Sequence, residues 1–259
     1  MLRTEGMFMQ NIDSLYFLQP IVTIAFSSGL IIYWCLRRRF TIAAFLYSLI
    51  AYAGAIACKV ILQALTFNTV LAGFRGDLAL LGIYFAIQTV FFEVGGAYLV
   101  ALWGVSRVNL NSKDAEAYGI GLAFWENAGY LGVLGLFGLV SIYLNLNSGG
   151  AISQELYSSL INSRPNLFYP PSQALPLIGF SLLERVTSLL FHFSWGYLCL
   201  LAASLHKRRY FLFALPMGLL DFFVPFAGYL GIPIFELFIY VLGLCNLGVT
   251  LFITKRLRE

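Results

Sequence analysis

The sequence predicts an all-α membrane protein with seven transmembrane helices, its N-terminus outside and its C-terminus in the cytoplasm. Hydrophobic residues make up 60% of the chain and charged residues only 11%, whereas soluble domains carry about 25% charged residues. Seven apolar stretches each exceed the ~20 residues that cross a bilayer core. Basic residues gather in the loops on one side of the predicted membrane. These three observations indicate an integral membrane protein, which we expect in the plasma (inner) membrane.

The predicted spans cover residues 14–36, 41–67, 78–105, 115–144, 174–205, 210–230 and 233–254. The connections between them are short, except for a polar segment at 145–173 that contains a Gly-Gly pair and three prolines. This segment is the one connection long enough for extracytoplasmic structure. The sequence shows no internal repeat, so we expect residues 1–259 to form a single integral membrane domain.

Positive charge sets the predicted orientation. If Arg37, Arg38 and Arg39 are cytoplasmic, seven alternating spans place most other basic residues on the same side: Arg107, Lys113, Lys207, Arg208, Arg209, Lys255, Arg256 and Arg258. Only Arg3, Arg75 and Arg164 fall on the opposite side. An even number of spans would move one basic cluster outside, so the asymmetry also supports the count. The net charge of +4 is thereby explained by topology, and no nucleic-acid partner is expected.

Four different spans carry an acid or a histidine at one common depth. Counted at ~1.5 Å per residue from the cytoplasmic end of each span, they lie ~15–22 Å deep: Glu93, Glu126, His192 and Asp221. A charge near mid-bilayer costs roughly 3 kcal/mol on insertion scales, so such residues usually face a partner or a cavity. Unrelated polar residues would not align in depth. We therefore predict that these four residues form one buried site.

Further ionisable residues lie within the spans. Arg185 and His192 are seven residues apart on nearly one helical face, so Arg185 can serve as a counter-ion to a buried acid, with Glu184 beside it. Lys59 can pair with an acid or extend toward the membrane interface, and the second is expected; Glu236 is expected at the outer boundary. Helix association by hydrogen bonds alone is the simpler alternative for all these groups.

The order of the polar motifs carries a family resemblance. The chain reads FFEVGGAYLVALWGVSR, then GIGLAFWENAGYLG, then ERVTSLLFHFSWGYL and finally LPMGLLDFF. This series resembles the YhfC-type branch of the glutamic intramembrane proteases. That branch is akin to the PrsW-like proteases, the CAAX prenyl endopeptidases and the gamma-secretase scaffold subunit. The resemblance covers about residues 51–223.

The resemblance implies a glutamate that acts as general base on a water, and histidines that orient the water or stabilise an oxyanion. It makes Glu93, Glu126, His192 and Asp221 the catalytic candidates, supported by Glu184 and Arg185. Several positions depart from the family pattern. Phe92 stands in place of a glutamate, Gly96 in place of an arginine, and Leu122 and Met217 in place of histidines. Because imidazole is a preferred zinc ligand and one such histidine remains, we expect neither a metal nor another cofactor.

Three functions are open at this point. We expect a non-catalytic scaffold or complex subunit with the intramembrane-protease fold and a degenerate acid and histidine site. The first alternative is an active intramembrane peptidase that uses a buried glutamate as general base. The second is a proton-linked transporter, although the sequence shows no inverted repeat and no matching pair of broken helices. The expected partners are the lipid bilayer and a transmembrane substrate or partner subunit.

Overall fold

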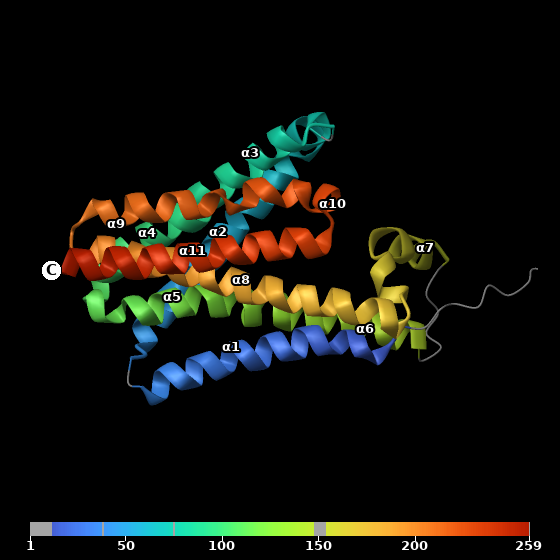
Figure 1. Cartoon of the computed structure of the whole chain (residues 1–259), viewed down its shortest axis with the longest axis horizontal. Coiled ribbons are helices and arrows are strands. Elements are labelled where there is room, and N and C mark those ends of the chain that lie inside the picture. Colours follow the sequence, from blue (N-terminus) through green and yellow to red (C-terminus); the bar gives the residue numbers. More distant parts are fainter. Residues whose placement is uncertain (1–11, 38, 75, 148–153, 259) are drawn as a thin grey trace, which may run out of the picture.

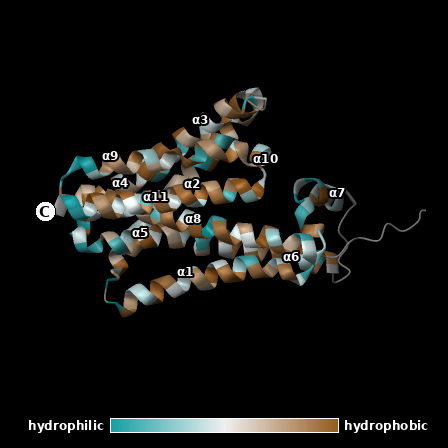
Figure 2. Cartoon of the chain, in the orientation of Figure 1, coloured by the Kyte–Doolittle hydropathy of each residue, from teal (hydrophilic) through white to brown (hydrophobic). Residues whose placement is uncertain are grey.

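The computed structural model describes residues 12–37, 39–74, 76–147 and 154–258, and every regular element among them is helical. Seven helical segments are long and apolar enough to cross a membrane. They form one elongated bundle (Figure 1), in which hydrophobic residues cover the length of the helices and hydrophilic residues lie mostly near the ends (Figure 2). The predicted fold class is confirmed, while the orientation of the termini stays a prediction.

The observed spans follow the predicted ones closely. The largest difference is at the end of the second span, which reaches Leu71 because a π-helical turn, η2 (Phe67–Leu71), extends helix α2 (Ile42–Thr66). The seven spans are Ser14–Leu36, Ile42–Leu71, Leu78–Val108, Ser112–Leu146, Pro171–Ser204, Arg208–Leu230 and Ile232–Arg256.

The polar connection at 145–173 is partly helical. Helix α6 (Gly135–Asn147) runs into it, and α7 (Gln154–Ser163) and the 3-10 turn η6 (Pro165–Phe168) follow. The Tyr16 hydroxyl, at the start of the first span, donates a hydrogen bond to the carbonyl of Asn166. This contact ties the connection to the bundle. Residues 148–153 of the connection lie outside the described residues, as do Arg3, Arg38 and Arg75 of the predicted charge pattern.

Helix α8 (Pro171–Ser204) is the central element of the bundle. In an 18-residue apolar stretch of its span, 72% of the residues are buried by protein, whereas the corresponding share in the other six spans is 17–28%. Helix α8 makes its most extensive contacts with α4 (Gly96–Val108), α5 (Ala115–Phe124), α9 (Arg208–Ala214) and α11 (Ile232–Arg258). Polar side chains on α8 are consequently shielded from lipid.

Three spans depart from α-helical geometry part-way along their length. Two contain π-helical turns, and the third contains a 3-10 segment bounded by Pro216 and Pro225. Proline lacks the N–H that an α-helix requires, and a 3-10 run of this length is uncommon. These segments are η3 (Thr89–Gly95), between α3 (Leu78–Gln88) and α4; η5 (Trp125–Leu134), between α5 and α6; and η7 (Leu215–Phe226), between α9 and α10 (Ala227–Leu230).

Helices α5 and α8 approach each other closely at two glycines. A Cβ added to Gly196 would lie 2.9 Å from the Cα of Gly119, and one added to Gly119 would lie 2.6 Å from the carbonyl oxygen of Phe193. Small residues at such a crossing allow backbones to pack directly, which is a common basis of helix association in membranes. The contact also holds η5, which continues α5, beside α8.

We predict that Gly196→Ala lowers the thermal midpoint of the detergent-purified protein, because overpacking a tight contact costs about 1–3 kcal/mol. The matched control is Gly179→Ala on the same helix, where an added Cβ meets nothing within 4 Å. That control should leave the midpoint unchanged or raise it, since alanine is the better helix former. Equal midpoints for the two variants would contradict this account of the packing.

Candidate functional site

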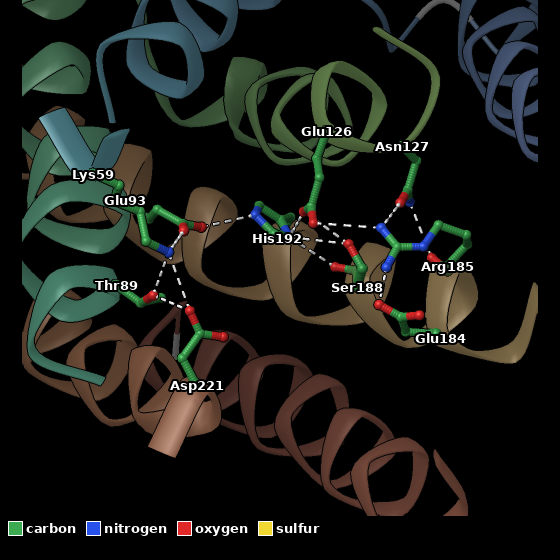
Figure 3. A network of polar contacts seen from close by, with 10 residues as sticks. All are labelled: Lys59, Thr89, Glu93, Glu126, Asn127, Glu184, Arg185, Ser188, His192 and Asp221. Carbon is green, nitrogen blue, oxygen red and sulfur yellow. Dashed lines mark hydrogen bonds and ion pairs between the residues drawn. The ribbon is translucent and has the colours of Figure 1, made fainter. Parts of the chain in front are cut away.

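The four residues that share a predicted depth also line one cavity of about 240 Å³: Glu93, Glu126, His192 and Asp221. Their side chains point toward a common region of the bundle (Figure 3). The three acids come from the irregular segments η3, η5 and η7, whereas His192 comes from the regular helix α8. A π-helical turn contains one residue more than an α-helical turn and redirects the side chains around it, which is why such turns are frequent at functional sites.

His192 lies between the two glutamates. Its Nε2 is 3.1 Å from an oxygen of Glu93, and its Nδ1 is 2.7 Å from Oε2 of Glu126. The Ser188 hydroxyl donates to the same Glu126 oxygen at 2.8 Å. A neutral imidazole carries one N–H, and an ionised carboxylate only accepts hydrogen bonds. Nδ1 also lies 3.0 Å from the Ser188 carbonyl oxygen, so both ring nitrogens face oxygens that accept hydrogen bonds, whereas a neutral imidazole can donate from one nitrogen only.

Lys59 is a central member of the site, and the expectation that it extends toward the interface is wrong. Its Nζ forms an ion pair with Glu93, lies 3.1 Å from Asp221 and donates to the Thr89 hydroxyl at 2.7 Å. Thr89 in turn donates to Asp221. The lysine side chain thus extends into the bundle, toward two carboxylates, and not toward water at the membrane surface. The same depth count contained a signal for this pairing, because it places Lys59 ~27 Å along its span and Glu93 ~21 Å along the next one, a difference of about one lysine side chain.

Arg185 neutralises the other end of the network, as its spacing from His192 indicated. Its guanidinium lies 3.6 Å from Glu126 and forms an ion pair with Glu184. Asn127 fixes the arginine, since its amide nitrogen donates to the Arg185 carbonyl at 3.0 Å. Residues 185, 188 and 192 lie on one face of α8 because they are three and seven residues apart. Ser188 and Asn127 are neutral, so the charge pattern of the sequence gave no signal for them.

The ionic contacts form one continuous chain across the bundle. It runs from Asp221 through Lys59, Glu93, His192 and Glu126 to Arg185 (Figure 3). This chain of contacts joins side chains from five spans, the second to the sixth. Such a network can hold charges inside a membrane, and a hydrogen-bonded acid–imidazole–acid series can also pass a proton. Within the described residues, no group of three or more histidine, cysteine or acidic residues is arranged to hold a metal ion.

Glu236 is buried at this cavity and lies near the start of α11, the end of the last span at which the sequence placed it, while its position relative to the membrane boundary stays a prediction. The residue is 7% exposed because α11, which carries it, packs against α8. It lines the cavity together with Glu184 and Arg185.

The cavity adjoins an apolar groove of about 630 Å³ formed by α2 and η5. Tyr52, Ile56 and Tyr130 line both the cavity and the groove. The groove-lining residues Val60 and Ile61 are 54% and 59% exposed, so the groove opens on the outer, lipid-facing surface of the bundle. The buried charges thus lie next to a lateral opening.

A family model described as "YhfC intramembrane metalloprotease" matches residues 21–229, which is most of the 259-residue chain. The matched region includes all ten residues of the network in Figure 3. No curated protein and no solved structure matches the chain.

We predict that Lys59→Met strongly destabilises the protein. The change leaves Asp221 without an ion-pair partner among the described residues and Glu93 with His192 alone, and removal of one partner from a buried ion pair costs about 3–5 kcal/mol. Thermal unfolding in detergent, followed by the loss of monodisperse protein, measures the effect. Lys113→Met changes an exposed lysine and is the matched control.

Asp221→Asn in the Lys59→Met background should recover part of the lost stability, because it removes the charge that has lost its partner. A Lys59→Met protein as stable as the wild type would show that the network does not neutralise these acids.

Proposed function

We propose that this chain, which belongs to the YhfC intramembrane metalloprotease family, is a non-catalytic member that acts as a membrane scaffold or complex subunit. The observation that carries the proposal is the state of Glu93, the residue that could stand in as general base where Phe92 replaces the glutamate that the resemblance implies. Lys59 occupies one of its carboxylate oxygens and His192 the other. A general base must present an oxygen to the water from which it takes a proton.

The other acids are held in the same manner. Glu126 contacts Arg185 through one oxygen and both His192 and Ser188 through the other. One oxygen of Asp221 accepts from Lys59 and Thr89. The chain's own cations and hydroxyls therefore contact both oxygens of Glu93, both oxygens of Glu126 and one oxygen of Asp221. A hydrogen-bonded core that fixes five spans to one another is the role that this arrangement supports.

The family description implies a metal, and the residues present do not fit one. Zinc in catalytic sites takes three protein ligands, commonly histidines. Both ring nitrogens of His192 already face carboxylates, and the ammonium of Lys59 lies between Glu93 and Asp221, where a bridging cation would lie. Leu122 and Met217, the positions at which resemblance implies histidines, belong to the hydrophobic core. We derive no metal-dependent step for this chain.

The cavity favours one second candidate, an active intramembrane peptidase. It reaches Glu93, Glu126 and His192, and the adjoining groove would admit a substrate segment from the lipid. In this alternative Glu93 would act as the base after a rearrangement that frees one of its oxygens from Lys59 or His192. The proton-linked transporter stays a prediction from sequence. For all of these, we propose the plasma membrane as the location and a transmembrane protein as the partner.

We predict that Glu93→Gln preserves function in source cells that accumulate the variant to the wild-type level, because Asp221 still pairs with Lys59 and the amide oxygen can still accept a hydrogen bond. Three strains would express the wild type, the Glu93→Gln variant or no protein, and the abundance and fragments of their membrane proteins would be compared. If the chain is a scaffold, the strain that expresses Glu93→Gln should have the same membrane proteins as the wild type, and only the strain without the protein should differ. If Glu93→Gln instead matches the deletion, and intact substrates accumulate in both, the chain is a peptidase. Glu155→Gln, at an exposed position, is the matched control.

We also predict that the purified chain carries less than one equivalent of zinc and that a chelator leaves its thermal midpoint unchanged. The reason is that Lys59 and Arg185 already neutralise the buried acids. Elemental analysis of detergent-purified protein, before and after dialysis against the chelator, provides the measurement. One tightly bound zinc per chain, lost together with stability, would refute the assignment.

A further inference from the structure

Glu236 has a buried carboxylate oxygen that the network does not use. The residue lies on α11 and is 7% exposed. Its Oε2 meets no hydrogen-bond donor among the described residues, yet the side chain lines the cavity. A buried carboxylate without a partner is costly, so it takes up a proton or pairs with a donor that enters the cavity.

The cavity carries an excess of acidic groups. Five carboxylates line it: Glu93, Glu126, Glu184, Asp221 and Glu236. Three basic side chains face them: Lys59, Arg185 and His192. Even with His192 protonated, two carboxylates lack a matching positive charge. A cationic ligand would supply positive charge and, if it carries N–H groups, the donor that Glu236 lacks.

Aromatic rings make up much of the remaining cavity wall: Tyr52, Tyr130, Phe191, Trp195 and Phe235. The faces of aromatic rings attract ammonium groups by cation–π interaction, with a strength of about 0.5–2 kcal/mol that depends on desolvation. The wall therefore suits an organic cation better than a strongly hydrated metal ion. The volume of about 240 Å³ has room for an ammonium group and its first methylenes.

The adjoining groove indicates what the rest of this ligand is. Tyr52, Ile56 and Tyr130 form a boundary shared by the cavity and the groove. Beyond them the groove is lined almost entirely by apolar side chains of α2 and η5, such as Leu49, Val60 and Leu134. An apolar chain lying in the groove would reach the acidic cavity at one end.

We propose that the cavity binds the primary ammonium group of an amphiphile whose apolar chain lies in the groove between α2 and η5, with Glu236 as the direct partner of the ammonium. This site is independent of the proposed scaffold function. It uses an acid that the network leaves free, and it assigns a ligand class to the lateral opening.

The test uses the full chain in detergent micelles, with n-dodecylamine as probe. Binding is followed by tryptophan fluorescence, because Trp195 lines the cavity and Trp125 lines the groove. Dodecylammonium should produce a saturable change, while dodecanol, of equal length and without charge, should not. Glu236→Gln should weaken dodecylammonium binding about tenfold or more, as expected for a lost hydrogen bond to a charged group. Glu155→Gln, which alters an exposed acid elsewhere, should bind like the wild type.

Val60→Trp provides a second variant that leaves the cavity unchanged. Val60 is half exposed on the groove, so a larger side chain there should obstruct the apolar chain and weaken binding without unfolding the protein. Several results would overturn the proposal. These are equal dodecylammonium affinity in Glu236→Gln and the wild type, equal binding of dodecanol, no saturable change, or a Glu236-dependent response to zinc alone.

Discussion

The ammonium of Lys59 is the interaction on which the rest of the site depends. It lies between Glu93 and Asp221 and so joins α2, η3 and η7. Charges within a bilayer are tolerated only when they are paired or solvated, and an unpaired carboxylate there would be strongly destabilising. Because the lysine satisfies two acids at once, the second, third and sixth spans have to meet at this level. His192 and Arg185 then neutralise Glu126, and Arg185 also pairs with Glu184.

Helix α8 provides the fixed side of this arrangement. It is covered by protein on most of its surface, and it carries Arg185, Ser188 and His192 on one face. The facing acids come from turns that are π-helical or 3-10, in which side chains leave the α-helical register. A regular helix therefore presents the basic groups, and irregular segments supply acids that reach them. Close backbone contact at Gly119 and Gly196 keeps the segment with Glu126 beside this helix.

Much of the fold and part of the site follow from the sequence alone. Hydropathy and span length predict seven helices because the bilayer imposes one length on all of them. Depth counting places Glu93, Glu126, His192 and Asp221 at one level because rise per residue varies little between helices. The direction of each side chain around its helix is not available from such a count, since π and 3-10 turns change it. Lys59 was misplaced for a related reason, because a general tendency toward the interface was applied where neighbouring helices cover the side chain.

The family relationship and the geometry of this chain lead to different expectations for a metal, and the position of Lys59 decides between them. The most direct measurement is an experimental structure in a lipid nanodisc prepared with added zinc. Our account predicts the lysine ammonium between Glu93 and Asp221, and His192 between Glu93 and Glu126, with no metal density among them. A metal bound by His192 and the acids, with Lys59 turned away toward the lipid, would contradict it.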